Sequence, residues 1–430
     1  MKKNILVIFY IYLITFCLYG QENVKNDRLK NDKALRESAH KGNLTAQKKL
    51  AYEYFMGNNR SRNYKLAVYW FKKAAEQNDS FSKFNLAVCY SKGLGIKENK
   101  YLAFKLCEEV ANDIPKAKYM LAQFYQKGFL PVNNDPRTAL QANLSKASKL
   151  YEQLITKDKY ADAYYSYAKM LLTNIDATEK DKEKAVKLLQ IAIKNNDSHA
   201  MNLLADCYNS GDGVPQSFQK MFFWLKKSSL QNNHHAIARL AHCYYHGYGT
   251  KTNRKLAFKL FKHAAAVNEP MAMNQMGDFY AYGEFVEENL TTAVEWYKKA
   301  AEAKNTNAIY TLATFYIKGI YFKKDLQKAA RLLHQGSLLN NSKAQYEFAS
   351  MLLAGAGVKT NVNLAFYWFE KSALNNYAPA QRELAICFLN GIGTLKDTKK
   401  TLFWLKKAAE NGDMRSKALY LEMLKNNKGE

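Results

Sequence analysis

The fold is decided by the stretch Met276–Ala301, which reads MGDFYAYGEFVEENLTTAVEWYKKAA. Apolar residues recur in it every three to four positions, both before and after Gly283. This spacing predicts two helices, each with one apolar face, and a turn at the glycine between them. The ending Trp-Tyr-Lys-Lys-Ala-Ala returns, with small changes, after Trp70 and after Trp404. The stretch is therefore one copy of a repeat.

The five tryptophans of the chain all stand at this place in the repeat, and they are Trp70, Trp224, Trp296, Trp368 and Trp404. The last three are spaced by 72 and 36 residues, so the unit has 36 residues. We expect an all-α fold, a right-handed α/α superhelical solenoid of about ten helix–turn–helix units, because one helix pair cannot bury its apolar surface alone. Leucine replaces tryptophan at Leu106, Leu260 and Leu332, so we expect the tryptophans to be inter-helix core.

The first helix of each unit carries a large anchor residue, followed by a small residue, a Tyr four positions on and a Gly seven positions on. We expect that glycine to end the helix in the left-handed conformation. The anchors are Leu50, Leu86, Leu121, Tyr167, Leu204, Leu240, Met276, Leu312, Phe348, Leu384 and Tyr420.

The repeat also sets the expected domain boundaries. We expect an N-terminal cap at residues 21–45, a first sub-array at 46–175, further repeats with a C-terminal cap at 176–424, and a tail at 425–430. The regularity is expected to break near residues 130–180. Extra residues lie there around Val132 to Leu144, and the unit anchored at Tyr167 lacks the terminating glycine.

Residues 1–20 differ from the rest. Lys2 and Lys3 precede an almost wholly apolar run from Ile5 to Leu18, which is typical of a secretory signal peptide cleaved after Gly20. We therefore expect an exported protein, periplasmic or secreted, that is not an integral membrane protein after cleavage. An uncleaved membrane anchor is the alternative.

The net charge is +26, and much of it lies in Lys-Lys pairs on the second helices. A solvated outer surface explains it, and attraction to an acidic envelope polymer or to lipid headgroups is the alternative. Nucleic acid is not an expected partner of an exported chain without a binding motif. Five cysteines follow the signal, four of them at one register, and they are expected to be core residues. A single Cys89–Cys107 bridge is the alternative.

The segment Met276-Gly277-x-x-Tyr280-x-x-Gly283, followed by Ala293-x-x-Trp296-Tyr297-x-Lys299-Ala300-Ala301, resembles the Sel1-like repeat family, which is related to tetratricopeptide repeats. The resemblance extends from Ala46 to about Leu424. It implies binding and scaffolding of other proteins, often in bacterial envelopes or secretory compartments, and it implies no cofactor.

In tetratricopeptide-like stacking the first helices line a concave groove, and the positions not used for packing face it. Exposed aromatic and apolar groups there are typical of peptide recognition, while packing against the adjacent helix is the alternative. The candidate partner-binding residues are Phe84, Tyr119, Tyr165, Asp206, His242, Tyr245, His246, Asp278, Tyr282, Tyr310 and Tyr346.

Histidines cluster in one first helix, where His235, His242 and His246 share a face. The neighbouring units present Asp206 and Asp278 at the register of His242. Such a row is a weak candidate for a divalent metal site, with His242 and His246 as ligands, or for a pH-sensitive patch. A polar stretch of groove is the favoured interpretation.

We therefore expect a non-enzymatic scaffold or adaptor of the bacterial cell envelope that holds a protein or peptide in its concave groove. Patterns of metalloprotease, P-loop, serine-hydrolase and redox sites are missing from the sequence. The alternative is a cell-wall-binding or β-lactam-hydrolysing enzyme that resembles cysteine-rich Sel1-like proteins. Those carry a regular disulfide in every unit, and this chain lacks the cysteines for it.

Overall fold

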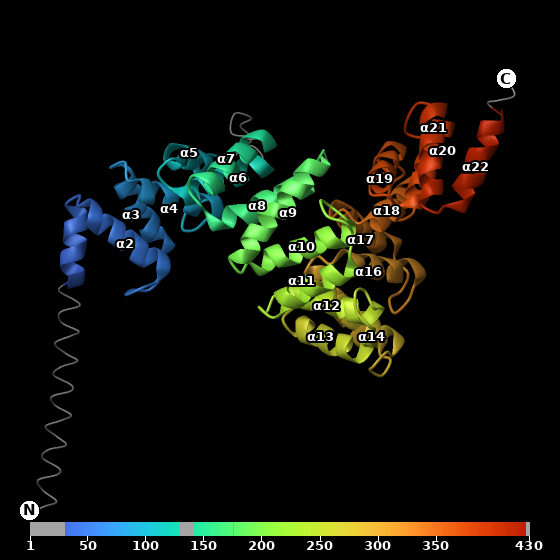
Figure 1. Ribbon diagram of the computed structural model, residues 1–430, viewed down its shortest axis with the longest axis horizontal. Coiled ribbons are helices and arrows are strands. Elements are labelled where there is room, and N and C mark those ends of the chain that lie inside the picture. The colour runs from blue at the N-terminus through green and yellow to red at the C-terminus, as the bar shows by residue number, and fades with distance from the viewer. Residues whose placement is uncertain (1–30, 130–140, 175, 427–430) are drawn as a thin grey trace, which may run out of the picture. The chain divides into compact units, whose positions relative to one another are not determined.

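The computed structural model describes residues 31–129, 141–174 and 176–426, and helices connected by short turns make up most of them (Figure 1). None of the described residues forms a β-strand. The chain forms two compact units, unit 1 at residues 1–196 and unit 2 at residues 197–430. The predicted all-α solenoid of helix–turn–helix repeats is confirmed, since each helix packs chiefly against the helices before and after it.

Unit 1 begins, within the described residues, with helical residues 31–40. Its further helices are α2 (Leu44–Met56), α3 (Tyr64–Ala75), α4 (Ser80–Lys92), α5 (Lys100–Val110), α6 (Pro115–Lys127), α7 (Leu144–Thr156), α8 (Ala161–Thr173) and α9 (Glu179–Lys194). Even-numbered helices are the first helices of the repeats, and odd-numbered helices are the second.

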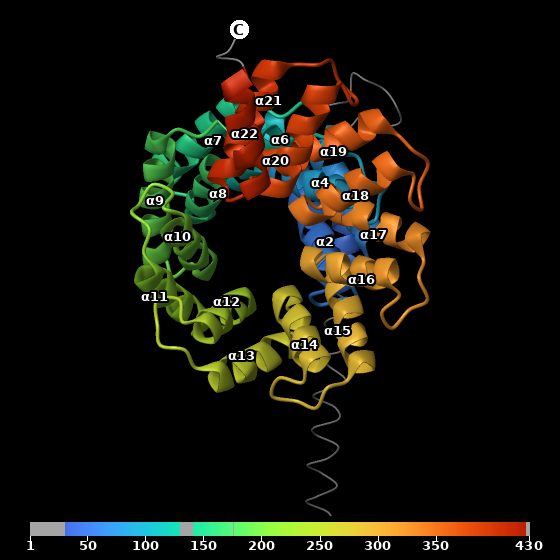
Figure 2. The same cartoon turned by 90° about the vertical axis from the view of Figure 1, so that its right-hand side faces the viewer.

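Unit 2 contains α10 (Ser198–Ser210), α11 (Phe218–Ser229), α12 (His234–His246), α13 (Arg254–Ala266), α14 (Pro270–Tyr282), α15 (Leu290–Glu302), α16 (Thr306–Lys318), α17 (Leu326–Leu338), α18 (Ser342–Ala354), α19 (Val362–Leu374), α20 (Ala378–Asn390), α21 (Thr398–Glu410) and α22 (Met414–Asn426). Figure 2 shows the first helices α10, α12 and α14 on the inner side of this curved unit, with α11 and α13 on the outer side. We call the side formed by the first helices α10 to α20 the inner face.

Short polar residues fix where the helices begin. The Asn253 side chain accepts a hydrogen bond from the Leu256 backbone N–H, which satisfies one free donor of the first turn of α13. The Asn253 backbone N–H donates to the Tyr244 carbonyl at 2.8 Å and so closes the turn between the two helices. Asn63, Asn99 and Asn289 repeat both contacts in their own units.

Glycine ends the first helices as predicted. Gly247 closes α12 in the left-handed conformation with φ +81°, where its N–H donates to the Cys243 carbonyl. A second glycine, Gly249, allows the turn to lie against the preceding repeat, because a Cβ there would be 2.0 Å from the Phe218 carbonyl oxygen. The turn chemistry therefore also sets the distance between repeats.

The tryptophans only partly match the prediction that they are core. Trp70 and Trp368 are buried, whereas Trp224, Trp296 and Trp404 are half-buried at the edge of their clusters. The residue after the tryptophan lies deeper in every case, namely Phe71, Leu225, Tyr297, Phe369 and Leu405. A helix rotates by about 100° per residue, so only one of two adjacent side chains can point to the centre of the core. The three half-buried tryptophans still pack against core clusters, from the side and not from the centre.

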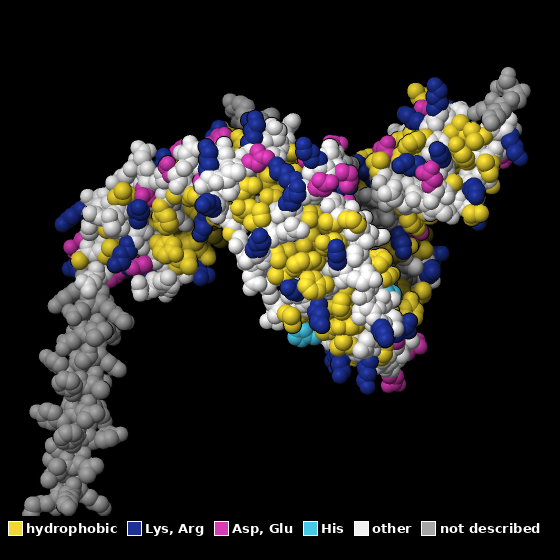
Figure 3. Space-filling model, viewed as in Figure 1, with side chains coloured by type: hydrophobic (Ala, Val, Ile, Leu, Met, Phe, Trp, Pro, Cys, Tyr) yellow, Lys and Arg dark blue, Asp and Glu magenta, His cyan; other side chains and the backbone are white. Residues whose placement is uncertain are grey.

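The lysine pairs are exposed, as expected of a solvated outer surface. Two of these lysines lie beside a tryptophan: Lys299 Nζ is 4.8 Å from the Trp296 ring centre, and Lys227 Nζ is 5.7 Å from that of Trp224. Residues three positions apart share a helix face, which brings the ammonium group over the partly exposed ring. On the face in Figure 3, Lys and Arg side chains are scattered over both units and do not gather in one patch.

Buried glutamines join successive repeats. Gln381 is fully buried, donates to the Ala373 carbonyl, and accepts from Asn411 Nδ2 at 2.9 Å. Gln345 makes the equivalent bonds to Ser337 and Asn375. These amides satisfy each other in the interior and fix the register between neighbouring helix pairs.

The boundary between the compact units follows Asn196 and not residue 175, the predicted end of the first sub-array. The difference arises because α9 is the second helix of its repeat and packs on α8. As predicted, α8 ends without a left-handed glycine, at an extended Asn174. The predicted signal at 1–20, the first ten residues of the predicted cap at 21–45 and most of the inserted residues lie outside the described residues. So does the tail from residue 427 on.

All five cysteines of the described residues are buried free thiols, so the prediction of core cysteines is confirmed. Burial raises the pKa of Cys89 and Cys107 to about 12 and that of Cys243 to about 11. Among the described residues, none of the helices combines the length and the apolar character that a bilayer crossing requires.

Candidate functional site

The three candidate residues of unit 1 are largely used by the fold. Phe84 is half-buried and packs against the core cluster around Leu121. The Tyr119 hydroxyl is hydrogen-bonded to the Ser166 hydroxyl at 2.6 Å, and so ties α6 to α8. Tyr165 is half-buried beside Lys169, whose Nζ is 5.9 Å from the ring centre. In unit 1 the packing alternative therefore explains Phe84 and Tyr119.

Unit 2 brings together a first group on its inner face, the histidine cluster of His242, His246 and Tyr248. The His242 and His246 ring centres are 4.4 Å apart, as expected for residues one helical turn apart. The Tyr248 ring stacks on His246, with centres 5.5 Å apart. Partial burial lowers the pKa of His242, and the charges of His246 and Arg239 lower it further. His242 is therefore neutral at neutral pH.

A hollow of about 180 Å³ lies beside the histidine cluster, between α10, α11, α12 and the start of α14. Its lining is part polar and part apolar, and consists of Asn209, Met221, Leu225, Arg239, His242, Cys243, Tyr248 and Met271. The raised pKa of Cys243 leaves its thiol protonated, so the hollow lacks an activated sulfur nucleophile among its lining residues. The hollow is large enough for a small side chain. Its one cationic lining residue, Arg239, is already ion-paired with Asp206.

The predicted His–Asp row is not assembled as a set of ligands. Asp206 is ion-paired with Arg239, and Asp278 accepts a hydrogen bond from the Tyr297 hydroxyl at 2.7 Å. His235 Nδ1 lies 3.0 Å from a Glu269 carboxylate oxygen, away from the other two histidines. Within the described ranges, no group of three or more His, Cys, Asp or Glu side chains could hold a metal ion. His242 and His246 remain a pair without a third ligand there.

The carboxyl groups of Asp206 and Asp278 are partly withdrawn from water. Burial raises the pKa of Asp206, although the Arg239 charge opposes the rise. Burial likewise raises the pKa of Asp278, against the hydrogen bond from Tyr297. Each of the two carboxyl groups already has a partner within the protein, Arg239 for Asp206 and Tyr297 for Asp278.

Tyr245 and Tyr282 lie at the edge of the unit, near the turns. The Tyr245 hydroxyl donates to Glu284 in the next repeat, and Arg254 lies 5.0 Å from its ring centre. Its ring also contacts Phe279, with centres 6.0 Å apart. Tyr245 therefore serves packing between repeats. Tyr282 ends α14 and is 80% exposed, so it is available for contact on that edge.

A second group on the inner face, the tyrosine cluster, contains Tyr310 of α16, Tyr346 and Glu347 of α18, and Tyr377 at the start of α20. The Tyr346 and Tyr377 rings meet edge to face, with centres 5.6 Å apart and an interplanar angle of 70°. All four side chains are half-buried. Burial raises the pKa of each tyrosine first, and the negative charge of Glu347 raises all three further. The cluster is an aromatic surface beside the Glu347 carboxyl group, and the negative charge of Glu383 also acts on Tyr346.

Sequence reasoning found Tyr310 and Tyr346 from their shared register but missed Glu347, Tyr377, Arg239 and Tyr248. Glu347 and Arg239 precede their anchors by one position, a register that we expected to face the groove without selecting these residues. Tyr377 and Tyr248 lie in turns, where the helical pattern predicts no direction. Only the stacking of the repeats brings them to the inner face.

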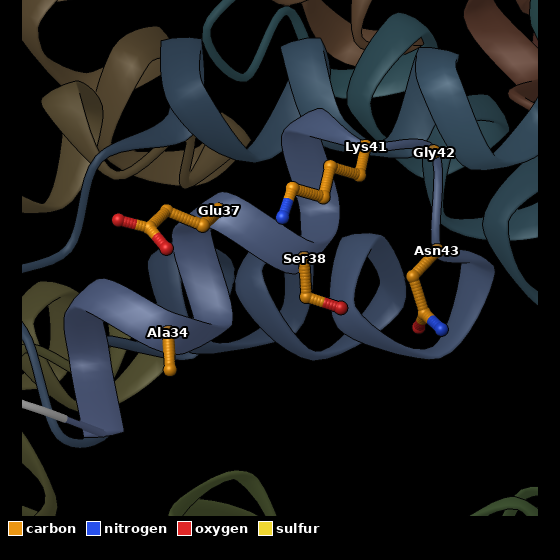
Figure 4. Close-up of a pocket in the computed structure, with 6 residues that line it drawn as sticks. All are labelled: Ala34, Glu37, Ser38, Lys41, Gly42 and Asn43. Atoms are coloured by element: carbon orange, nitrogen blue, oxygen red, sulfur yellow. The ribbon is translucent and has the colours of Figure 1, made fainter.

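A wider hollow of about 550 Å³ lies in unit 1, beside the helical residues 31–40 and the turn into α2. Figure 4 shows its lining of Ala34, Glu37, Ser38, Lys41, Gly42 and Asn43. One carboxylate, one ammonium group and small polar groups together favour no class of ligand. We therefore assign the hollow no role.

Comparisons with known proteins agree with the repeat architecture. The Sel1 repeat family model matches ten segments, at residues 44–79, 80–112, 115–141, 161–197, 198–233, 234–268, 270–305, 306–341, 342–377 and 378–413. A solved protective antigen of uropathogenic Escherichia coli strains, displaying an SLR fold, is similar over 92% of this chain and 90% of its own, with 22% identity and a TM-score of 0.50. A solved Sel1 repeat protein from Oxalobacter formigenes is 26% identical over 61% of this chain and 99% of its own, with a TM-score of 0.45.

A further relative is an exopolysaccharide production negative regulator of Rhizobium meliloti. It is 30% identical over 151 residues, which are 33% of this chain and 54% of the relative. The chain thus spans about half the length of this curated relative.

Proposed function

The chain belongs to the Sel1 repeat family, and we propose that it is an exported, non-enzymatic scaffold that binds a protein or peptide along the inner face of unit 2. The observation that carries this proposal is the tyrosine cluster. Half-buried aromatic rings of α16, α18 and the residue before α20 lie there near Glu347, whose negative charge acts on all three tyrosines. Rings that are neither buried in the core nor fully solvated are typical of sites that bind a peptide.

The repeats support a binding role over a catalytic one. Sel1 repeats are typically protein-interaction modules, and a relative of part of this chain is named as a regulator of exopolysaccharide production. The cysteine thiols, which would be the strongest nucleophiles, are buried and protonated. Export is proposed from the basic and apolar residues 1–20 alone, which lie outside the described residues.

Photo-crosslinking from one residue on each side of unit 2 tests the proposal. A photoreactive phenylalanine analogue replaces Tyr310 on the inner face or, as the matched control, Tyr367 on α19, which is 44% exposed. We expect a discrete protein adduct in the native envelope from position 310 only. Equal adducts from both positions, or none from position 310, would contradict binding on the inner face.

A sedimentation assay distinguishes the scaffold from the alternative of a cell-wall-binding protein or enzyme. The full chain is spun down with purified peptidoglycan, and the supernatant is tested for nitrocefin hydrolysis. The scaffold proposal expects neither retention nor hydrolysis. Retention on peptidoglycan without a protein adduct would favour the cell-wall-binding alternative, and turnover of nitrocefin would favour the enzyme.

A further inference from the structure

We propose that the tyrosine cluster is a receptor for one cationic side chain, a lysine or an arginine, of the bound partner. The inference rests on the proposed function, because it names the chemistry that the inner face recognises. The carrying observation is a carboxyl group on this face that the protein itself leaves without a partner, set among three aromatic rings.

Glu347 differs from the other carboxyl groups of the inner face. Asp206 is paired with Arg239, and Asp278 with Tyr297. Glu383, one repeat further along at the same register as Glu347, is paired with Arg382 at 3.3 Å. Within the described residues, the Glu347 side chain has neither a hydrogen bond nor an ion pair, although it is half-buried.

An unpaired carboxylate in this position is costly for the free protein. Partial burial raises the pKa of Glu347, and Lys318 opposes the rise only at a distance, without an ion pair. Bringing a positive charge to the carboxylate offsets the desolvation that the fold imposes on it. The site therefore favours a cation over a neutral or anionic side chain.

The aromatic rings of the cluster also favour a cationic ligand. Tyr346 and Tyr377 stand edge to face with their centres 5.6 Å apart, and Tyr310 occupies the register of Tyr346 on the preceding first helix. Aromatic faces attract ammonium and guanidinium groups, and they cover the apolar stem of a Lys or Arg side chain. The charge of Arg382 acts on Tyr346, but Arg382 itself is ion-paired with Glu383 and, at 2.7 Å, with Asp413.

The occupant is a side chain of a partner and not a metal ion. A metal site would need several oxygen or nitrogen ligands, and in the described parts of the chain no group of three His, Cys, Asp or Glu side chains could hold a metal ion. One carboxylate with aromatic neighbours suits a single organic cation, which the rings enclose from the side while the carboxylate binds its charge.

The test uses N-acetyl-lysine methylamide as the probe and its Nε-acetylated form as the neutral control. Saturation-transfer NMR on the full chain measures binding of each at millimolar concentration. We expect transfer to the lysine methylenes and at least about threefold less to the neutral control. The Glu347→Gln variant, which keeps the size of the side chain, should lose this difference. Glu302→Gln, an exposed glutamate at the end of α15, should keep it.

The outcomes separate the two proposals. Equal transfer to both probes, no transfer to either, or an unchanged preference in a folded Glu347→Gln variant would each overturn the cation receptor. A discrete inner-face adduct in the crosslinking assay would leave the scaffold standing in that event. Conversely, selective lysine binding without any adduct would reject the scaffold, and with it a partner's side chain as the occupant, while the cation preference of the cluster would stand. Circular dichroism confirms that each variant is folded, and Tyr346→Phe, which keeps the ring, should retain the preference.

Discussion

Replacing Gly277 by alanine tests whether the Tyr297 ring on α15 requires a residue without a side chain at this position of α14. Gly277 follows the anchor Met276 on α14, at a register where Ala241 and Ala313 stand in the neighbouring repeats. A Cβ at Gly277 would lie 2.5 Å from Cε1 of Tyr297, well inside van der Waals contact. The alanine that suits the other repeats should therefore be harmful here.

The magnitude follows from how firmly the Tyr297 ring is held. The ring is 1% exposed, and its hydroxyl donates to Asp278 at 2.7 Å, so it cannot swing away without losing that bond. Overpacking of this kind costs about 1–3 kcal/mol. Gly→Ala within a helix returns roughly 1 kcal/mol. The two effects combine to about 0–2 kcal/mol, and we expect Gly277→Ala to destabilise unit 2 by about 1 kcal/mol.

A double-mutant cycle provides the assay. Urea unfolding is followed by circular dichroism, and amide hydrogen exchange in α14 and α15 reports on the local stability of the repeat. In the Tyr297→Leu background the ring is gone, and Gly277→Ala should become neutral or stabilising by up to about 1 kcal/mol. If the alanine has the same effect with and without the tyrosine ring, the steric argument is refuted.

The remaining predictions concern the tryptophans, a buried carboxyl group and the thiols. Trp368→Ala should cost about 3–5 kcal/mol of local stability, because the side chain is 6% exposed. Trp296→Ala should cost clearly less, because Trp296 is half-buried. Equal losses of stability, measured by hydrogen exchange, would contradict the assigned burial. The raised pKa of Asp278 means that the folded state holds a proton that the unfolded state has already released, so stability falls as the pH rises from the ordinary aspartate range through the raised value. Asp278→Asn, which can still accept from Tyr297, should therefore gain stability over wild type at pH 7 but not at pH 3; a gain independent of pH in urea titrations would show that ionisation is not its cause. Cys17, the cysteine within residues 1–20, is replaced by serine so that only the five buried thiols are probed. In this variant the thiols should resist iodoacetamide at pH 8 when native and react fully in urea, because burial raises their pKa to about 11–12. Rapid labelling of the native protein would show that they are accessible.

The fold could be predicted closely because it depends on local sequence signals that recur in every repeat. Helix periodicity, asparagine caps and left-handed glycines act over a few residues, and each recurs at the same register. The depth of burial of the tryptophans was not predictable in the same way, because each stands next to another apolar residue. The apolar pattern does not show which of two adjacent apolar side chains points to the centre of the core. Burial then depends on the exact rotation of the helix, which neighbouring repeats decide.

The candidate site was only partly predictable for a related reason. Tyr310 and Tyr346 share a register, so their common face could be inferred, whereas Tyr377 lies in a turn with no periodicity. The sequence also could not show that Asp206 meets Arg239 while Glu347 meets no charged partner among the described residues. Pairing across helices depends on side-chain directions and not on spacing along the chain.

The sequence alone determined the repeat, its helix–turn–helix unit, its core registers and its family resemblance. Those properties follow from interactions within one unit and between adjacent units, and these interactions are the same in each copy. Only the tertiary structure decided which inner-face charges are satisfied and which is left for a ligand. That distinction arises between repeats, where small differences at one register, such as arginine at 239 and glutamate at 347, change the local electrostatics without changing the fold.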